Sequence, residues 1–295
     1  MQNALPLDID GIATDAQAAM AGLLRRDVRL SNPDLLKQWN RNYVLRLDAA
    51  AAVALASFHV RTAGHGETFQ KLRDEAEGKR HLSIRERQPA EFRKLLLSVR
   101  KAFTSAGVRP SRGFAEEYEA VCDRLRNPGP FLTFTNGDIA PTNVFFTPSG
   151  PRLIDFEYCG YRHAFYDTTW WRIGLPLPDA AVDRIDRAYL DGIVGLFPTP
   201  PDATALYKEI ASISAHRLFW CLTWAFEDAL REPGVWVDDF TLRQAYTTYL
   251  RAFITVAERA DILPAMRSSA QSLQDRLTEL WGEADTREYN FPVFR

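Results

Sequence analysis

The most constraining feature of this sequence is a set of polar residues that brackets two short apolar segments. Asp138 is followed five residues later by Asn143, and Asp155 comes directly after the second apolar segment. The segments 144–146 and 152–154 read as short strands, and the Pro and Gly between them are typical of a tight turn. In such a hairpin, the residue entering the first strand and the residue leaving the second lie side by side. The pattern therefore predicts that Asn143 and Asp155 meet at the open end of a hairpin, with Asp138 on the loop just before them.

These three side chains have the chemistry of a magnesium site. Mg²⁺ takes oxygen ligands, usually one or two carboxylates, and completes its octahedron with water and phosphate oxygens. In phosphoryl transfer a further Asp accepts the proton of the attacking hydroxyl, and protein kinases use an Asp-x-x-x-x-Asn step before a metal-binding Asp. Here the motifs read Asn-Gly-Asp and Asp-Phe-Glu rather than His-Arg-Asp and Asp-Phe-Gly. Those two differences point away from protein kinases.

Three short motifs together resemble the aminoglycoside phosphotransferase family, whose members are small-molecule kinases and include choline-kinase-like enzymes. The motifs are Thr135–Phe146, Leu153–Glu157 and Phe165–Asp167. An upstream stretch, residues 54–59, is similar to the helix that opens the C-terminal lobe in this family. The resemblance covers roughly residues 5–260.

The resemblance implies a role for each motif residue. Asp138 resembles the catalytic base of the family, and Asn143 and Asp155 resemble its magnesium ligands. Asp167 resembles the Asp that braces the catalytic loop from the following helix. Asn136 stands where the family usually has a mostly structural His, so the replacement is expected to be tolerated. The implied cofactors are ATP and Mg²⁺, and the implied partner is a small molecule that offers a hydroxyl acceptor.

The N-terminal part of the sequence lacks the features of a nucleotide-binding lobe. Before Asp48 there is no Gly-rich loop and no alternating strand pattern, and Lys37 is the only Lys. Residues 5–11 are interpreted as the hinge strand that would meet adenine. Two explanations stay open, a shortened sequence or a true loss of the lobe, and the complete metal site favours the first.

The pattern of helices and turns predicts a mostly helical α+β fold with one or two small β-hairpins, and the resemblance implies that it is a kinase-like C-terminal lobe. The predicted domains are a hinge or N-lobe remnant at 1–45, the helical lobe at 46–284 with its catalytic loop at 135–157, and a tail at 285–295. A short strand is predicted at 131–134. Predicted helices span residues 14–25, 49–63, 66–87, 89–106, 114–126, 164–173, 179–195, 202–230, 239–260 and 265–283.

A concentration of aromatic and acidic residues in the helical part has two interpretations. Trp220 and Trp224 lie four residues apart, on one helical face, and packing in the core explains most of the group. The alternative is an acceptor pocket in which aromatic rings and carboxylates hold an amino or quaternary ammonium substrate. The candidate lining residues are Glu157, Trp171, Trp224, Glu227 and Asp228. For Glu157, metal support or an ion pair with Arg152 or Arg162 is also open.

Composition argues against several other classes of protein. A net charge of −2 provides no electrostatic case for binding nucleic acid or an anionic membrane. No apolar run approaches the ~18 residues of a spanning helix, and no signal peptide is visible. The widely spaced Cys122, Cys159 and Cys221 fit neither a disulfide framework nor a zinc site, which indicates a cytoplasmic protein. His59 is expected to pack at the end of its helix with a backbone partner.

Two classes of function remain. The first is an ATP- and Mg²⁺-dependent phosphotransferase that acts on an amino sugar, a choline-like alcohol or an amino alcohol. The second is a pseudokinase or binding module, favoured by the missing phosphate-gripping Lys and loop. Against the second stands the intact set of Asp138, Asn143 and Asp155, because the two Asp carboxylates would repel each other without a cation. The sequence leaves the oligomeric state undetermined.

Overall fold

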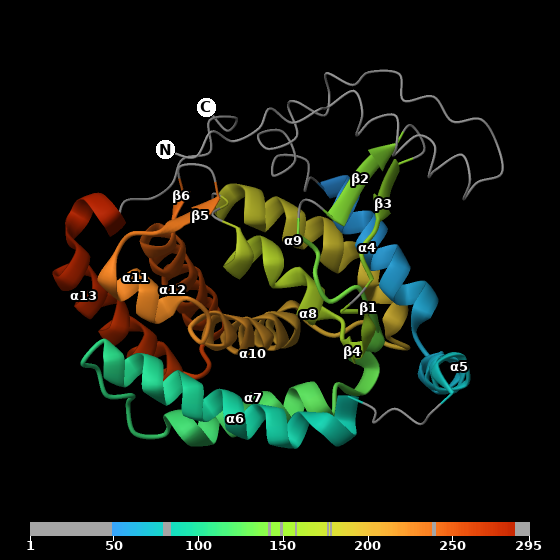
Figure 1. The fold of residues 1–295 in the computed structure, drawn as a ribbon. Helices are drawn as coiled ribbons and strands as arrows, with labels where there is room; N and C mark the ends of the chain where they lie inside the picture. The colour runs from blue at the N-terminus through green and yellow to red at the C-terminus, as the bar shows by residue number, and fades with distance from the viewer. Residues whose placement is uncertain are drawn as a thin grey trace, which may run out of the picture. The chain divides into compact units, whose positions relative to one another are not determined.

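The structure, a computed structural model, describes residues 49–78, 84–140, 143–147, 150–156, 158–175, 177, 179–237 and 240–286 (Figure 1). The chain divides into two compact units, Met1–Arg46 and Leu47–Arg295, and the described residues belong to the second. The predicted hinge, the predicted helix at 14–25, Glu157 and most of the predicted tail lie outside the described residues.

Helices make up most of the described chain, which confirms the predicted fold class. They are α4 (Ala49–Thr62), α5 (Gly66–Glu77), α6 (Ile84–Ser105), α7 (Phe114–Arg126), α8 (Phe165–Thr168), α9 (Asp179–Ile193), α10 (Ala203–Cys221), α11 (Phe226–Arg231), α12 (Leu242–Ala260) and α13 (Pro264–Thr286). Short 3₁₀ turns occur at Gly129–Phe131 and Val194–Leu196, and a π turn spans Trp170–Gly174.

Three two-stranded antiparallel sheets accompany these helices in the described part of the chain. The pairs are β1 (Leu132–Thr135) with β4 (Gly160–His163), β2 (Val144–Thr147) with β3 (Gly150–Leu153), and β5 (Val235–Val237) with β6 (Phe240–Thr241). The β2–β3 hairpin forms where the sequence predicts it, with Val144 opposite Leu153. β4 and the β5–β6 hairpin were not predicted, because strands this short carry almost no alternating pattern.

Two predicted helices are divided in the structure. Gly78, with φ 64°, ends α5 within the predicted span 66–87, because glycine enters the left-handed region without a Cβ penalty. The predicted helix at 202–230 is likewise split, since α10 ends at Cys221 and α11 begins at Phe226. Hydrophobic content alone could not locate these breaks.

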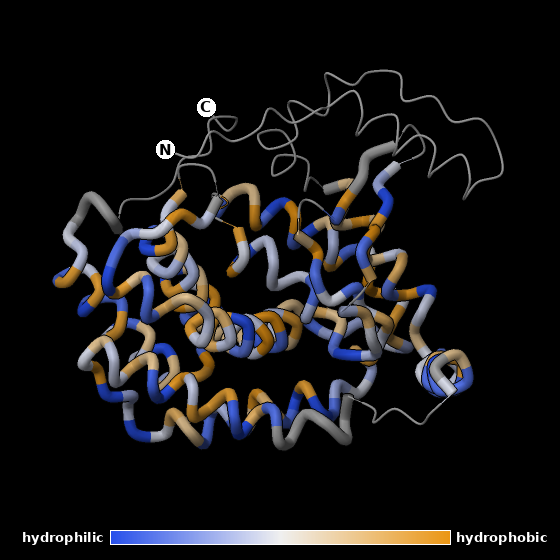
Figure 2. The backbone as a smooth tube through the Cα atoms, viewed as in Figure 1, coloured by the Kyte–Doolittle hydropathy of each residue, from blue (hydrophilic) through white to orange (hydrophobic). Residues whose placement is uncertain are grey.

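Helix α10 lies at the centre of the helical part and packs against α6, α7, α8 and α12 (Figure 1). Every residue from Ile210 to Phe219 is buried, so the helix has no solvent-facing side over this stretch. Figure 2 shows it as a mainly hydrophobic segment interrupted by polar residues. Four of the buried residues are polar, Ser212, Ser214, His216 and Arg217, and each therefore needs partners in the interior.

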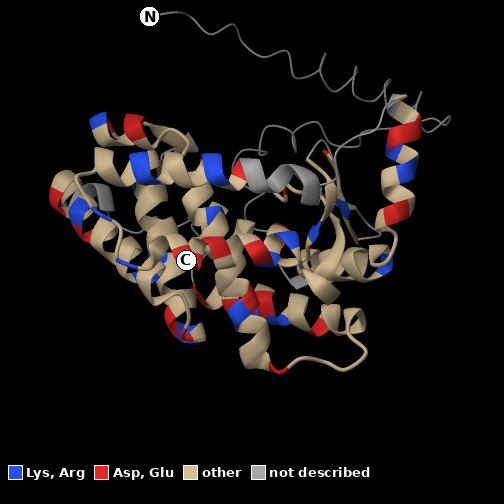
Figure 3. Cartoon of the chain, turned by 90° about the horizontal axis from the view of Figure 1, so that it is seen from below, with Lys and Arg blue, Asp and Glu red and all other residues tan. Residues whose placement is uncertain are grey.

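Charged residues of both signs alternate along the outer helices (Figure 3). Within the described residues, no helix combines the length and the apolar character that a membrane crossing requires. Figure 2 shows α5 as a hydrophilic helix over most of its surface, in keeping with the charged composition of the predicted 66–87 segment.

A buried ion pair joins the π turn to α9. Both Arg172 and Asp186 are about one-twentieth exposed or less, and their side chains form an ion pair. The Asp186 carboxylate also accepts hydrogen bonds from Arg172 Nε at 3.0 Å and from Trp171 Nε1 at 2.7 Å. The carboxylate thus satisfies three buried donors, and its removal would leave a charge without a partner.

We therefore expect Asp186→Ala to lower the free energy of unfolding by about 3–5 kcal/mol, since Arg172 would stay buried and unpaired. Asp183 on the same helix offers a matched control, because it pairs with Arg259 at 3.0 Å and both side chains are half exposed. Asp183→Ala should cost less than about 1 kcal/mol. Urea unfolding measures both values, and equal losses in the two variants would contradict this account.

Candidate active site

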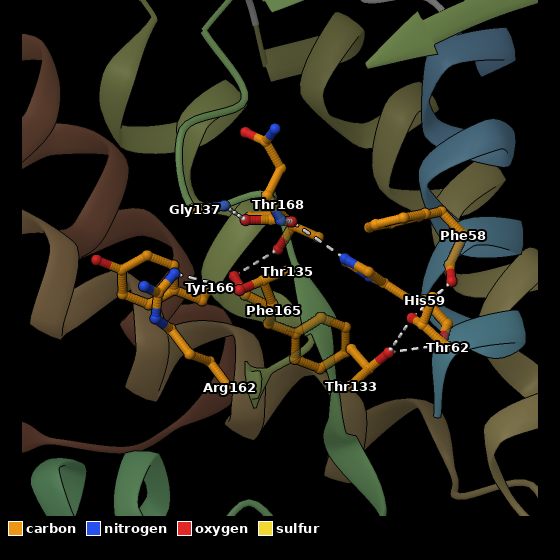
Figure 4. A network of polar contacts seen from close by, with 12 residues as sticks. Phe58, His59, Thr62, Thr133, Thr135, Gly137, Arg162, Phe165, Tyr166 and Thr168 are labelled. Atoms are coloured by element: carbon orange, nitrogen blue, oxygen red, sulfur yellow. Dashed lines mark hydrogen bonds and ion pairs between the residues drawn. The ribbon is translucent and has the colours of Figure 1, made fainter. Parts of the chain in front are cut away.

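The loop between β1 and β2 is held in place by Asp167 from α8. One carboxylate oxygen accepts a hydrogen bond from the backbone N–H of Asn136 at 2.9 Å, and the other accepts one from Gly137 at 2.8 Å. Asp167 has no exposed surface. Figure 4 shows Gly137 of this loop and His59 of α4 in the same network of polar contacts. A single buried carboxylate therefore determines where this loop lies relative to α8.

His59 of α4 supports Asp167 from the opposite side. Its Nε2 lies 3.1 Å from the Asp167 carboxylate, and its Nδ1 lies 2.7 Å from the Tyr189 hydroxyl of α9. Burial raises the pKa of Tyr189 well above its ordinary value, so the phenol stays protonated. Donation from this hydroxyl to Nδ1 leaves the imidazole proton on Nε2, where it faces the carboxylate. His59 thus binds two side chains rather than the backbone partner that the sequence suggested.

Asn136 connects the β1–β2 loop to the end of the β2–β3 hairpin. Its side-chain oxygen accepts a hydrogen bond from the backbone N–H of Asp138 at 3.0 Å. Its side-chain nitrogen donates to the backbone carbonyls of Ile154 at 3.0 Å and Asp155 at 3.2 Å. An amide can make both kinds of contact because it carries a donor and an acceptor. One fully buried side chain therefore positions the backbones of Asp138 and Asp155 relative to each other.

Gly137 occupies a position that other residues could not take without moving the backbone. Its φ of 90° lies in the left-handed region. A Cβ at this residue would collide with the backbone carbonyl of Tyr158 and lie 2.6 Å from Arg162 Nη1. The loop can approach the segment before β4 this closely only because Gly137 has no side chain.

Asn143 and Asp155 lie at the open end of the hairpin. The backbone N–H of Ile154 donates to the carbonyl of Asn143 at 3.0 Å, which extends the strand pairing by one step. Asn143 is buried, and its side-chain nitrogen donates to the Asp138 carbonyl at 2.9 Å. Asp155 is exposed and has a φ of 57°, a conformation that Asp tolerates better than most residues. The structure therefore brings Asp138, Asn143 and Asp155 into one region.

The side-chain oxygens in this region suit a Mg²⁺ ion that is bound partly by the protein and partly by phosphate. The Asn143 nitrogen also lies 3.3 Å from a carboxylate oxygen of Asp138, so the nitrogen faces Asp138 and the amide oxygen is the atom with the chemistry of a metal ligand. The exposed Asp155 carboxylate offers a second oxygen in the same region. Among the residues that the structure describes, no three His, Cys, Asp or Glu side chains gather to hold a metal by themselves. Mg²⁺ suits such a partial set, because it usually keeps water and takes phosphate oxygens.

A cavity of about 450 Å³ lies beside the same loop, between α6, α7, α8, α10 and β4. Its walls include Phe92, Tyr166, Trp220 and His216, together with Arg162 from β4. Arg162 connects the cavity to the end of β1 and to the segment before β4, since it donates to the Thr135 hydroxyl at 3.2 Å and to the Tyr158 carbonyl at 2.5 Å. The volume falls within the usual range for small-molecule sites, roughly 300–1,000 Å³.

The residues that the sequence proposed as a substrate pocket are not gathered around this cavity. Trp171 is fully buried in the core against Asp186. Trp224 is 41% exposed and lies between the rings of Trp220 and Trp236. Glu227 pairs with Lys101 at 2.7 Å, and Asp228 pairs with Arg231 at 3.5 Å. Glu157 lies outside the described residues.

Sequence reasoning missed four residues around the loop and cavity, His59, Tyr189, His216 and Arg217. For His59 a signal existed, because it ends the family-like stretch at 54–59. For His216 and Arg217 a signal existed, because two polar residues stand side by side within an apolar run. Such residues are seldom buried, yet both are buried in α10. Tyr189 had no such signal, since a Tyr on an amphipathic helix reads as an ordinary core residue.

Burial, together with the positive charges of Arg217 and Arg162, lowers the pKa of His216 to about 3 from its ordinary 6.5. The unfolded chain therefore binds a proton here below pH 6.5 that the folded chain does not bind. As the pH falls from 7 to 5, this residue should lower the free energy of unfolding by about 2 kcal/mol. We expect His216→Phe to remove that part of the acid sensitivity in urea unfolding at the two pH values. An unchanged pH dependence would contradict the assignment.

Gly137→Ala should destabilise the protein more than the same substitution at Gly64, which has a φ of 81° and open space around it. Gly64→Ala should cost about 1 kcal/mol for the left-handed backbone alone. Gly137→Ala adds the collision with Tyr158, for a total of about 2–4 kcal/mol. Equal shifts of the two variants in thermal unfolding would show that the close approach at Gly137 is unimportant.

The sequence around this site is similar to that of a known protein family. A model of the phosphotransferase enzyme family matches residues 47–203, more than half of the chain, including the loop, the hairpin and α8. No curated protein matches the sequence. The crystal structure of an aminoglycoside phosphotransferase from Alicyclobacillus acidocaldarius subsp. acidocaldarius DSM 446 has a TM-score of 0.41 and 14% identity. That match covers 82% of this chain and 69% of the other, and a likeness at this level supports no argument. By the family match, this chain belongs to the phosphotransferase enzyme family.

Proposed function

We propose that this chain is an ATP- and Mg²⁺-dependent phosphotransferase that acts on a hydroxyl group of a small molecule. The observation that carries the proposal is the placement of Asn136. Its side chain holds the backbone of Asp138 at 3.0 Å and that of Asp155 at 3.2 Å, so a base and a metal ligand have a common support. Family membership provides the reaction class.

Asp138 is the proposed base. In the reaction, the acceptor oxygen forms a bond to the γ-phosphorus, the bond to the β,γ-bridging oxygen breaks, ADP leaves, and the hydroxyl proton passes to Asp138. Because the transition state for phosphoryl transfer is loose, positioning and charge neutralisation dominate the rate. Asp138 therefore has to orient the hydroxyl, and it does not need an unusual pKa.

Asn143 and Asp155 are the proposed holders of Mg²⁺, which would neutralise charge on the phosphates. Asn143 also donates to the Asp138 carbonyl at 2.9 Å, so the metal ligand and the base are in direct contact. The Asp155 side chain is exposed, as a ligand that must meet ATP from solvent should be.

Asn136, Asp167 and His59 are the proposed positioning residues. They are fully buried, and they connect the loop to α4 and α8. Side chains that are locked by packing and hydrogen bonds hold a reactive geometry to within a fraction of an ångström, and small displacements reduce rates strongly. Their contribution would be to hold Asp138 in the position from which it orients the acceptor hydroxyl.

Calorimetric titration with ATP, with and without Mg²⁺, tests the proposal. We expect Mg²⁺-dependent binding to the intact chain and its loss by at least about tenfold in Asp155→Asn, because a charged metal ligand is removed. Asp138→Asn should keep the binding and reduce turnover by about 10²–10⁴-fold. Asp183→Asn, a surface change on α9, is the control that should alter neither quantity.

Two other results would overturn the proposal in different ways. If the chain bound Mg²⁺–ATP but transferred no phosphoryl group to any hydroxyl compound, and Asp138→Asn left ATP binding unchanged, the protein would be a binding module. Absence of binding at millimolar ATP would show that the proposed metal ligands do not form a nucleotide site in this chain.

A further inference from the structure

Three buried side chains, Tyr189, His59 and Asp167, form a series of hydrogen bonds that ends at the β1–β2 loop. The Tyr189 hydroxyl of α9 lies 2.7 Å from Nδ1 of His59, and Nε2 of His59 lies 3.1 Å from a carboxylate oxygen of Asp167. The carboxylate in turn accepts hydrogen bonds from the backbone N–H groups of Asn136 and Gly137. Tyr189 therefore stands at the end of the series away from the loop.

The series has the chemical order of a Ser–His–Asp triad, a hydroxyl, an imidazole and a carboxylate, but its burial argues against a direct catalytic role. Tyr189 is 1% exposed, and His59 and Asp167 have no exposed surface. None of the three side chains can therefore touch a substrate. Any influence of the series on a reaction has to pass through the loop whose backbone Asp167 holds.

The orientation of the His59 ring depends on contacts at both of its nitrogens. Rotation about the bond that carries the imidazole has no sharply preferred angle, so the rotamer alone does not fix the plane of the ring. A half-turn of the ring would exchange Nε2 with a ring carbon, and Asp167 would lose a donor. The hydrogen bond at Nδ1 opposes that half-turn, because only one of the two orientations presents a nitrogen to the Tyr189 hydroxyl.

Tyr189 also determines which nitrogen of His59 carries the proton. Burial, together with the negative charge of Asp167, raises the pKa of Tyr189 well above its ordinary value, so its hydroxyl keeps a proton to donate. Nδ1 accepts that hydrogen bond and stays unprotonated, and the neutral ring carries its hydrogen on Nε2. The ring therefore presents a donor to the carboxylate rather than a lone pair.

A close approach of α4 and α9 brings Tyr189 within reach of His59. The two helices pack side by side (Figure 1), and a Cβ at Gly192 would lie only 2.6 Å from the Cβ of Ala56, which is too close for two carbon atoms. Tyr189 lies three residues before Gly192, and His59 lies three residues after Ala56, so each pair shares one face of its helix. The missing side chain of Gly192 thus allows the separation that the hydrogen bond requires.

We propose that Tyr189 is a positioning residue, which acts through His59 to hold Asp167 in the orientation that anchors the β1–β2 loop and its base, Asp138. The effect on rate rests on the proposed phosphotransferase function, whereas the effect on the loop does not. Without the hydroxyl, Nδ1 of His59 would be buried and unpaired, and the ring could leave the orientation in which it donates to Asp167. The loop would then lose part of its support, although no residue of the loop had changed.

Amide hydrogen exchange of the intact chain, followed by NMR without nucleotide, tests the effect on the loop. Tyr189→Phe removes only the hydroxyl, and we expect exchange at Asn136 and Gly137 to become about tenfold faster, as the loss of a buried hydrogen bond implies. Tyr249→Phe is the matched control, because it removes a similarly buried hydroxyl that donates to the Gly174 carbonyl, and it should leave both amides unchanged. Unchanged exchange in Tyr189→Phe, or a uniform acceleration across α4, α9 and the loop, would overturn the proposal.

Two further measurements separate positioning from packing. In His59→Gln, an amide nitrogen can donate to Asp167 with no imidazole tautomer to be set, so adding Tyr189→Phe should leave exchange at the loop nearly unchanged. Thermal unfolding verifies that each variant is folded. An equal acceleration by Tyr189→Phe in both backgrounds would show that Tyr189 acts by packing alone. Nitrogen NMR of the intact chain should find His59 protonated on Nε2 and unprotonated on Nδ1, and a proton on Nδ1 would equally contradict the proposal.

Hydrolysis of Mg²⁺–ATP by water connects the loop to the reaction without any acceptor. Tyr189→Phe should lower its kcat about tenfold, because a displaced loop misplaces Asp138, while Tyr249→Phe should not change it. An unchanged kcat in Tyr189→Phe would refute the role in the reaction. Where the intact chain hydrolyses no ATP, hydrogen exchange alone decides whether Tyr189 holds the loop, and the ATP titration decides the proposed function, so the two failures are separable.

Discussion

The arrangement of the candidate active site depends on one buried carboxylate. Asp167 accepts the backbone N–H groups of Asn136 and Gly137 at 2.9 and 2.8 Å, and His59 holds the carboxylate from the other side at 3.1 Å. Each donor is buried, so none of these contacts competes with water. A buried carboxylate without such donors would be costly, and the loop without the carboxylate would lose its anchor. The carboxylate and the loop therefore stabilise each other.

Asn136 transmits that placement to the second half of the site. The side chain takes its position from a loop that Asp167 holds, and it passes the position on to Asp138 and to the backbone at Ile154 and Asp155. A His at this position would have one donor and one acceptor at most in its neutral form, whereas the amide offers two donors and an acceptor. The unusual Asn-Gly-Asp sequence is thus compatible with a well-connected loop. The same loop passes close to Arg162, which lines the neighbouring cavity.

Prediction from the sequence succeeded where the signal was local. The β2–β3 hairpin follows from a Pro- and Gly-containing turn between two apolar segments. Helix α4 follows from its Ala-rich composition and its flanking residues, and α7 follows from its amphipathic pattern. It failed for β4, because a four-residue strand is defined by its pairing with β1 and not by its composition. It also failed for the split between α10 and α11, which interrupts a continuous run of apolar residues.

The sequence by itself determined the mostly helical class, the order of the elements, and the motif that joins Asp138, Asn143 and Asp155, because these depend on residues a few positions apart. The tertiary structure alone decided the support of the loop and the character of the cavity. His59 meets Asp167 across 108 residues and Tyr189 across 130, and no periodic pattern encodes contacts at such separations. Likewise, Trp171 became a core residue and His216 a cavity residue only when packing determined which side of each helix faces the interior.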